Sequence, residues 1–260
     1  MLHRARKRFG QHFLHDAGVI RRIVDAIGPR PDNKMVEIGP GLGAITFPLL
    51  QRLGRLHVIE LDRDVLPALV KRCAGTGELI IYQADALKFD FSNLAPSEGK
   101  VRVVGNLPYN IATPLIFYLL EQLPAIEDMH FMLQREVVER ISASPSSGAY
   151  GRISVMMQYR CRCERLFTVG SGAFSPPPKI ESAFLRLTPY PKPQVAIDDE
   201  RRFALIVGRA FTQRRKKLKN ALKKLLSTEA IEAAGVDPSV RPEMLTLSDY
   251  AALSNVGQCD

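Results

Sequence analysis

The chain has 260 residues, of which 46% are hydrophobic and 24% are charged, a composition typical of a soluble globular protein of one or two domains. Extended disorder and fibrous repeats are therefore excluded. The formal net charge is +9, and two patches, residues 1–8 and 213–224, contain eleven cations and no acid, so the remainder has a net charge of −2. Such clusters attract a polyanion, although solvated surface segments have the same composition.

The sequence contains no pattern of a secreted, membrane-spanning or metal-binding protein. No run approaches the ~20 apolar residues that a membrane span needs. The basic N-terminus is followed by Gly10-Gln11-His12 rather than by an apolar segment, which argues against a secretory signal. The cysteines form no C-x-x-C pair and no zinc-binding spacing, so we expect reduced thiols in a cytosolic protein. They are Cys73, Cys161, Cys163 and Cys259.

Short β-branched runs alternate with helical stretches over the first two thirds of the chain. The predicted strands are Met35–Gly39, Leu56–Glu60, Leu79–Asp85, Val101–Gly105 and His130–Gln134. The helices predicted between them include Ile45–Leu53, Asp64–Arg72 and Thr113–Leu123. In the last of these, Thr113 is expected to be the N-cap and Pro114 the first helical residue. This alternation indicates βαβ units and an α/β fold with a parallel sheet covered on both faces.

Two later runs and a proline-rich stretch indicate where the first domain ends. Ile153–Tyr159 and Ala183–Leu187 are predicted to form an antiparallel hairpin that closes the edge of the sheet. The stretch Pro189–Pro193 contains three alternating prolines, which fit neither a central strand nor a helix. We therefore expect one domain in residues 1–190 and a second in residues 191–260.

The segment after this boundary has helical periodicity and no strand pattern, which predicts a small all-α unit. Its basic stretch, Gln213–Lys224, is predicted to be one helix with Leu218, Leu222 and Leu225 on the apolar side. We expect the cations of this helix to contact a polyanion.

Three features at the ends of consecutive predicted strands indicate an adenosine-containing ligand. The loop from Gly39 through Gly41 to Gly43 lets a ligand approach backbone N–H groups closely. Glu60 ends the second strand, where an acid can bind ribose hydroxyls, and Asp85 ends the third, where it can accept from an adenine amino group. Each feature alone is more typical of a tight turn or a solvated acid. Together they favour NAD or S-adenosylmethionine.

The run Asn106-Leu107-Pro108-Tyr109, which follows the fourth strand, favours methyl transfer to a nucleobase amino group over hydride chemistry. The lone pair of that nitrogen is delocalised into the ring, and acceptors for its two N–H bonds draw it out of conjugation. The Asn106 amide and the Leu107 carbonyl can accept these bonds, and Pro108 stiffens the backbone. Tyr109 offers a π-face to an extruded base, and Phe174 is a candidate for the opposite face. A strand-ending turn, and a packed Phe in a proline-rich loop, are the structural alternatives.

Six motifs, which occur in order along the chain, resemble those of one family. They are Lys7–Leu14 (KRFGQHFL), Glu37–Gly43 (EIGPGLG), Val58–Asp64 (VIELDRD), Gln83–Ala86 (QADA), Gly105–Asn110 (GNLPYN) and Phe174–Ser182 (FSPPPKIES). Together they resemble the small-subunit (16S) ribosomal RNA adenine-N6,N6-dimethyltransferase family (KsgA type) over nearly the whole chain. Members of this family often have Asn where this chain has His12.

The resemblance implies a Rossmann-like, seven-stranded S-adenosylmethionine-dependent methyltransferase sheet in the catalytic domain and a small all-α, RNA-binding C-terminal domain. It implies dimethylation of N6 of two adjacent adenosines in the 3′-terminal hairpin of 16S rRNA within an immature 30S subunit. The enzyme would be a cytoplasmic monomer with a role in small-subunit biogenesis, and it would need neither a metal nor a membrane.

The resemblance also implies roles for individual residues by motif position. The cofactor would be contacted by His12, Leu14, Gly39, Gly41, Glu60, Asp85 and Asn106. The target adenine would be held by Asn106, Leu107, Pro108 and Tyr109, with Phe174 opposite.

Three other functions are compatible with part of this pattern. The large-subunit rRNA adenine methylases of macrolide resistance share the fold and the N-x-P-[YF] motif. A non-catalytic ribosome-assembly factor would retain the fold and the basic patches. An NAD-dependent oxidoreductase fits worst, because the glycine loop lacks the third Rossmann glycine at its usual spacing.

Overall fold

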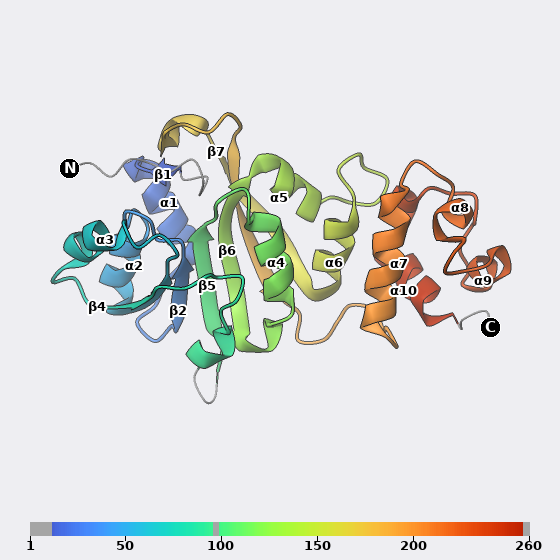
Figure 1. Cartoon of the computed structure of the whole chain (residues 1–260), viewed down its shortest axis with the longest axis horizontal. Coiled ribbons are helices and arrows are strands. Elements are labelled where there is room, and N and C mark those ends of the chain that lie inside the picture. The colour runs from blue at the N-terminus through green and yellow to red at the C-terminus, as the bar shows by residue number, and fades with distance from the viewer. Residues whose placement is uncertain (1–11, 96–98, 257–260) are drawn as a thin grey trace. The chain divides into compact units, whose positions relative to one another are not determined.

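The computed structural model describes residues 12–95 and 99–256 of the chain (Figure 1). The chain forms two units, and the first contains the residues up to Val138 together with Glu164–Pro189. The second unit contains Glu139–Cys163 and the residues from Tyr190 onward. The N-terminal basic patch, residues 1–8, lies outside the described residues.

The first unit is built on a seven-stranded sheet with the strand order β4-β3-β2-β5-β6-β9-β7. Its strands are β2 (Met35–Ile38), β3 (Arg55–Ile59), β4 (Glu78–Tyr82), β5 (Val101–Asn106), β6 (Ile126–Gln134), β7 (Cys161–Val169) and β9 (Ser182–Pro189). Neighbouring strands from β4 to β6 are parallel, and β9 pairs antiparallel with β6, with Phe131 opposite Leu185. The predicted α/β class is confirmed, as are the strands predicted at Met35, Leu56, Leu79, Val101, His130 and Ala183.

The order in which the strands are added to the sheet reverses at β2, and this reversal creates a place for a ligand. The order of the sheet puts β3 and β4 on one side of β2 and β5 and β6 on the other. All four residues of β2 are buried, as expected for a parallel strand that is covered on both faces. In open α/β sheets the crevice at the carboxyl ends of such neighbouring strands binds the ligand.

Helices connect these strands at nearly the predicted positions. They are α1 (Ala17–Ile27), α2 (Thr46–Leu53), α3 (Leu66–Cys73) and α4 (Ala112–Leu120), and α5 (Arg135–Ile141) follows β6. Asp16 caps α1 by accepting from the Val19 N–H at 2.8 Å. The predicted cap of α4 is wrong, because that helix begins at Ala112 and Thr113 and Pro114 lie within its first turn. Proline is tolerated there, since the first N–H groups of a helix have no intrahelical acceptor.

The second unit consists of helices around its own apolar core. They are α6 (Arg152–Arg160), α7 (Glu200–Thr212), α8 (Leu218–Leu222), α9 (Thr228–Ala233) and α10 (Leu247–Asn255). Phe203 and Val207 of α7 are fully buried in this core together with Tyr250 of α10. Asp199 caps α7 by accepting from the Arg201 N–H at 2.8 Å.

The strand predicted over Ile153–Tyr159 is wrong, because this segment forms helix α6. Val155 and Tyr159 are four residues apart and therefore lie on one helical face, and both are buried in the core of the second unit. The Tyr159 ring lies 5.1 Å from the ring of Phe203. Residues 139–163 therefore belong to the helical unit. The predicted division into residues 1–190 and 191–260 places them in the first domain instead.

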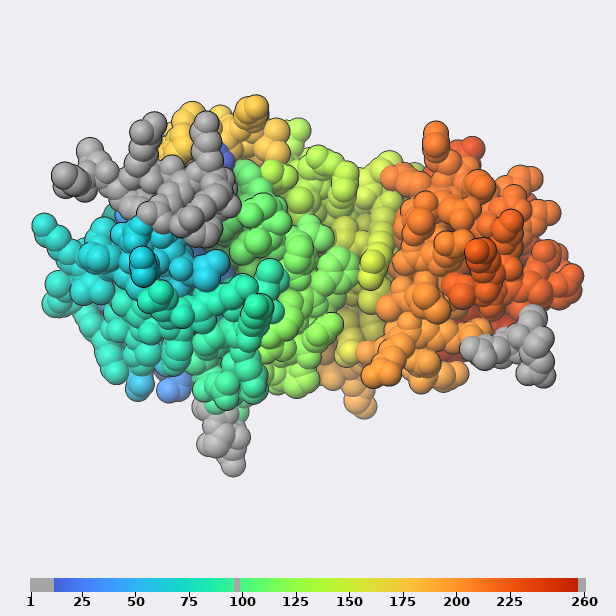
Figure 2. Space-filling view, viewed as in Figure 1, coloured from blue at the N-terminus to red at the C-terminus, as the bar shows by residue number. Residues whose placement is uncertain are grey.

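The basic stretch Gln213–Lys224 is not the single helix that its pattern predicts. Helix α7 ends at Thr212, a turn follows in which the Lys216 N–H donates to the Gln213 carbonyl at 2.8 Å, and α8 begins at Leu218. The leucine at the start of α8 is fully buried, whereas the cations of the stretch are exposed. This stretch belongs to the C-terminal part of the chain that is coloured orange to red in Figure 2.

Candidate active site

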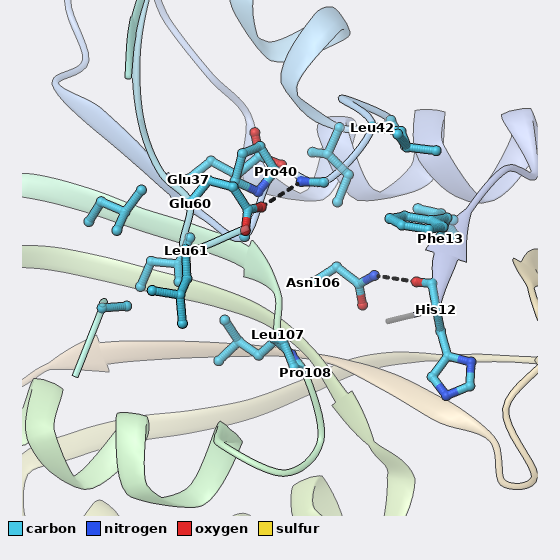
Figure 3. A pocket seen from close by; sticks show the side chains of 18 of the residues that line it. His12, Phe13, Glu37, Pro40, Leu42, Glu60, Leu61, Asn106, Leu107 and Pro108 are labelled. Atoms are coloured by element: carbon cyan, nitrogen blue, oxygen red, sulfur yellow. Dashed lines mark hydrogen bonds between the residues drawn. The ribbon is translucent and has the colours of Figure 1, made fainter. Parts of the chain in front are cut away.

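A cavity of about 500 Å³ lies in the first unit, at the carboxyl ends of β2, β3 and β5 (Figure 3). Ten of the eleven site residues predicted from the sequence line it. They are His12, Leu14, Gly39, Gly41, Glu60, Asp85, Asn106, Leu107, Pro108 and Tyr109. The eleventh, Phe174, does not line the cavity, and its side chain is only 2% exposed within the core.

The glycine loop after β2 forms one wall of the cavity. Gly39, Gly41 and Gly43 have φ angles of 67°, 53° and 79°, a left-handed region that disfavours residues with a side chain. A Cβ atom on Gly41 would lie 3.2 Å from the ring of Phe13, so the glycine also permits close packing of the N-terminal segment. The loop therefore exposes backbone rather than side chains to a ligand.

Glu60 follows β3 and is held by the backbone on both carboxylate oxygens. Oε1 accepts from the Asp62 N–H at 2.8 Å, and Oε2 accepts from the Gly41 N–H at 3.2 Å. Burial raises the pKa of Glu60, while these backbone hydrogen bonds act to lower it. A carboxylate has about four lone-pair positions, so this one can still accept from the two hydroxyls of a ribose.

Asp85 lies at the same edge of the sheet, in the loop after β4. Its Oδ1 accepts from the Leu87 N–H at 3.0 Å, which fixes the carboxylate at the wall of the cavity. The structure thus brings together the glycine loop and both acids, as their positions after consecutive parallel strands predict.

Asn106 ends β5, and its side-chain amide is oriented by the N-terminal segment. Its Nδ2 donates to the His12 carbonyl at 3.1 Å, which leaves Oδ1 as the acceptor that a ligand amino group can use (Figure 3). In the following turn the Pro108 carbonyl accepts from the N–H groups of Ile111 and Ala112, each at 3.1 Å. The preceding carbonyl, that of Leu107, is therefore the better second acceptor.

Tyr109 completes this side of the cavity. Its hydroxyl lies 2.7 Å from Ser182 Oγ, which fixes the ring, and burial raises the pKa of its hydroxyl. The ring is stacked against the imidazole of His12 with a centroid separation of 5.5 Å and an interplanar angle of 29°.

A two-stranded ladder brings the N-terminal segment to the cavity. β1 (Phe13–Leu14) pairs antiparallel with β8 (Phe174–Ser175), with Leu14 opposite Phe174. This pairing directs the Phe174 side chain into the core of the first unit, where Leu14 is also buried. Phe174 therefore does not face a bound base in this structure, and its predicted stacking role needs correction.

Sequence reasoning assigned no role to two residues that shape the cavity. Glu37, within β2, is 1% exposed, and among the described residues its Oε2 has no hydrogen-bond partner. Burial raises the pKa of Glu37 to about 7; the side chain of Thr46 opposes this shift, and the nearby Glu60 adds to it. Gly105, in β5, allows the backbones of β2 and β5 to approach, because a Cβ atom there would lie 2.6 Å from the Ile38 carbonyl oxygen. An acid within an apolar strand and a glycine before the Asn-Leu-Pro-Tyr run were the available signals.

No helix in the described part of the chain combines the length and the apolar character needed to cross a bilayer. Among residues 12–95 and 99–256, no three His, Cys, Asp or Glu side chains lie together as a metal site.

Comparisons with known proteins agree with this geometry. The family model described as "Ribosomal RNA adenine dimethylase" matches residues 2–258. "Ribosomal RNA small subunit methyltransferase A" of Pseudomonas aeruginosa is 58% identical over 97% of this chain and 94% of that protein. The protein of the same name from Nitrosococcus oceani is 56% identical over 97% of this chain and 96% of its own length.

Two solved structures have the same fold over most of the chain. A dimethyladenosine transferase from Plasmodium falciparum superposes with a TM-score of 0.79 at 23% identity, over 93% of this chain and 96% of that one. The 23S rRNA methyltransferase ErmE superposes with a TM-score of 0.72 at 26% identity, over 93% of this chain and 97% of that one.

Proposed function

The chain belongs to the ribosomal RNA adenine dimethylase family, and from this premise we propose that it dimethylates N6 of two adjacent adenosines in the 3′-terminal hairpin of 16S rRNA. The observation that carries the proposal is the oriented Asn106 amide at the edge of a cavity built for an adenosine cofactor. We propose S-adenosylmethionine as the methyl donor, the rRNA of an immature 30S subunit as the substrate, and a cytoplasmic monomer as the active form.

The residues that line the cavity support S-adenosylmethionine as the ligand. The glycine loop presents backbone at the wall, and Glu60 and Asp85 supply acceptors for ribose hydroxyls and an adenine amino group. The unpartnered Oε2 of the buried Glu37 favours a ligand that carries positive charge. When bound, the cofactor supplies a methyl group already activated on a sulfonium, so positioning can provide much of the rate acceleration.

The residues after β5 would prepare the acceptor nitrogen. Asn106 Oδ1 would accept one N–H bond of the adenine amino group, and the Leu107 carbonyl would accept the other. Both bonds favour a pyramidal nitrogen whose lone pair points to the methyl group. Tyr109, held by Ser182, would stack on the extruded base, as in other enzymes that modify flipped bases.

The second unit would bind RNA phosphates through its exposed basic stretch, Gln213–Lys224. Arg214 has a structural role within that stretch, because its Nη2 donates to the Gly148 carbonyl at 3.1 Å. Three neighbouring cations, Arg215, Lys216 and Lys217, are exposed and extend the basic surface.

Labelled-methyl transfer to small subunits from cells that lack this enzyme tests the reaction, and mass mapping identifies the methylated adenosines. Replacing Asn106 by Ala removes the amide acceptor, and we expect roughly 10²–10³-fold lower kcat with subunit binding retained. Asn93→Ala, an exposed asparagine that does not line the cavity, is the matched control. Undiminished transfer by Asn106→Ala would contradict the proposed role.

Two substrates separate this proposal from the large-subunit alternative. The small-subunit relatives at 56–58% identity favour 16S rRNA, whereas the ErmE likeness at 26% identity is weaker. We expect methyl transfer to small-subunit rRNA and not to free large-subunit rRNA offered at the same concentration. Calorimetry that detects no binding of S-adenosylmethionine would instead favour a non-catalytic assembly factor.

A further inference from the structure

His12 makes three contacts at the point where the target base must arrive. Its carbonyl accepts from Asn106 Nδ2 at 3.1 Å, and its ring stacks on Tyr109 at 5.5 Å. Its Nδ1 lies 2.7 Å from the Pro176 carbonyl, and because a carbonyl only accepts, Nδ1 carries the proton and donates. One residue thus joins the catalytic amide, the stacking tyrosine and the proline-rich loop.

The imidazole covers a face of Tyr109 on which a flipped adenine could stack. An adenine whose amino group donates to Asn106 must lie next to that side chain. In the proposed site it must also stack on Tyr109. The His12 ring meets the stacking condition, since it lies against the Tyr109 ring, while its backbone carbonyl holds the Asn106 amide. A separation of 5.5 Å lies within the 4.5–7 Å range of direct aromatic contact, so no base fits between the two rings.

The other aromatic candidate for this site does not reach it. Phe174 is 2% exposed in the core of the first unit and does not line the cavity, whereas His12 is half-buried and does. His12 lines the cavity and has its ring stacked on Tyr109.

We propose that the His12 imidazole is a stand-in for the target base: it covers the Tyr109 face in the free protein, and base capture requires the ring to leave. This inference rests on the proposed function and extends it by assigning a competitor for the adenine site. The competing contact is an aromatic stack, whose loss changes an affinity by about 2- to 10-fold.

The experiment measures how tightly the full chain binds a stem-loop RNA with 2-aminopurine at the target position, by fluorescence. We expect His12→Ala to bind this probe about 2- to 10-fold more tightly than the wild type, because the competitor is absent. His57→Ala is the matched control, since His57 stacks on Tyr82 at 5.8 Å outside the cavity and its loss should leave probe binding unchanged.

Tyr109→Ala shows whether the probe uses the stacking face at all. We expect this variant to bind the probe more weakly, and His12→Ala to have no further effect in the Tyr109→Ala background. The proposed role of His12 would be overturned if His12→Ala alone bound the probe as tightly as the wild type or more weakly while Tyr109→Ala still bound it more weakly. The proposed function would then remain intact. Unchanged binding by Tyr109→Ala would contradict the proposed function itself.

A measurement on the wild-type protein does not depend on the stability of any variant. The His12 ring is stacked on Tyr109, so we expect the resonance of its carbon-bound ring protons to lie upfield in the free protein. We expect it to move downfield when the 2-aminopurine stem-loop binds, because the ring leaves Tyr109. An upfield resonance that persists at saturating probe would overturn the proposal, since a merely structural histidine keeps its stack.

Discussion

At the scale of single residues, Glu37 is a buried acid that lines the cavity. It is 1% exposed, its Oε2 has no partner among the described residues, and Glu60 lies nearby. Burial disfavours the charged form, so between pH 4.5 and about 7 the folded protein holds a proton that the unfolded chain has lost. A cationic ligand would reverse this preference, which is consistent with a site for a sulfonium.

The contribution of Glu37 to the stability of the free protein should therefore fall as the pH rises. The pKa of Glu37 is raised from 4.5 to about 7, so its stabilising contribution is complete below pH 4.5 and is lost as the pH rises through 7. Glu37→Gln removes this dependence. We expect the difference in free energy of unfolding, variant minus wild type, to increase by about 3 kcal/mol from pH 4.5 to pH 8, as measured by urea denaturation. A difference that stays constant over this range would contradict the assignment.

Single residues also show how far the site follows from sequence. Glu60, Asp85 and Asn106 lie together because each ends or follows a parallel strand, and a strand pattern is readable from the chain. The sequence did not predict the direction of the Phe174 side chain, because that direction depends on pairing with Leu14, 160 residues away in the sequence. Long-range register of this kind leaves no local signal.

At the scale of elements, the approach of β5 to β2 depends on Gly105. A Cβ atom there would lie 2.6 Å from the Ile38 carbonyl oxygen, which is backbone and cannot move aside alone. Gly105→Ala should therefore separate the carboxyl ends of the two strands and displace the glycine loop from Asn106. We expect a loss of roughly 1–3 kcal/mol in the free energy of unfolding and weaker binding of S-adenosylmethionine by calorimetry.

Gly170→Ala is the matched control for this substitution. A Cβ atom on Gly170 meets nothing within 4 Å, and its φ of −67° suits any residue. Both quantities should stay close to those of the wild type, and an equal effect of the two substitutions would rule out the steric explanation.

Element type was predictable wherever one period dominated the pattern. The buried strands β2 and β5 are short apolar runs, and α7 has its apolar residues at helical spacing. Residues 153–159 fit both periods over so short a run, and only packing against Phe203 selects the helix. The basic stretch was predicted as one helix for a similar reason, whereas backbone hydrogen bonds from Leu218 to Val240 and from Lys219 to Pro238 fix a turn before α8.

At the scale of the whole molecule, the uneven charge predicts how RNA binding depends on salt. Arg215, Lys216 and Lys217 are exposed, whereas Arg214 is tied to Gly148. Reversing the three exposed cations to Glu should weaken small-subunit binding and reduce the slope of log affinity against log salt by about 2–3, measured by filter binding.

The control for this variant makes the same change in net charge elsewhere. Arg21, Arg30 and Lys34 are exposed in the first unit and do not line the cavity. Reversing the charge of these three residues should reduce the slope of log affinity against log salt less than reversing Arg215, Lys216 and Lys217 does. Equal slopes for both variants would show that total charge, and not the basic stretch, controls binding.

The helical unit is made of two separate chain segments, which restricts when it can fold during translation and where the chain can be truncated. Residues 139–163 leave the first unit, and the chain returns to it for Glu164–Pro189 before the remaining helices are made. Tyr150 and Val155 therefore have no core to enter until Phe203 and Tyr250 have been translated. A nascent chain stopped near residue 190 would expose this apolar surface, so a useful minimal catalytic fragment requires an internal deletion of residues 139–163 in addition to a C-terminal truncation.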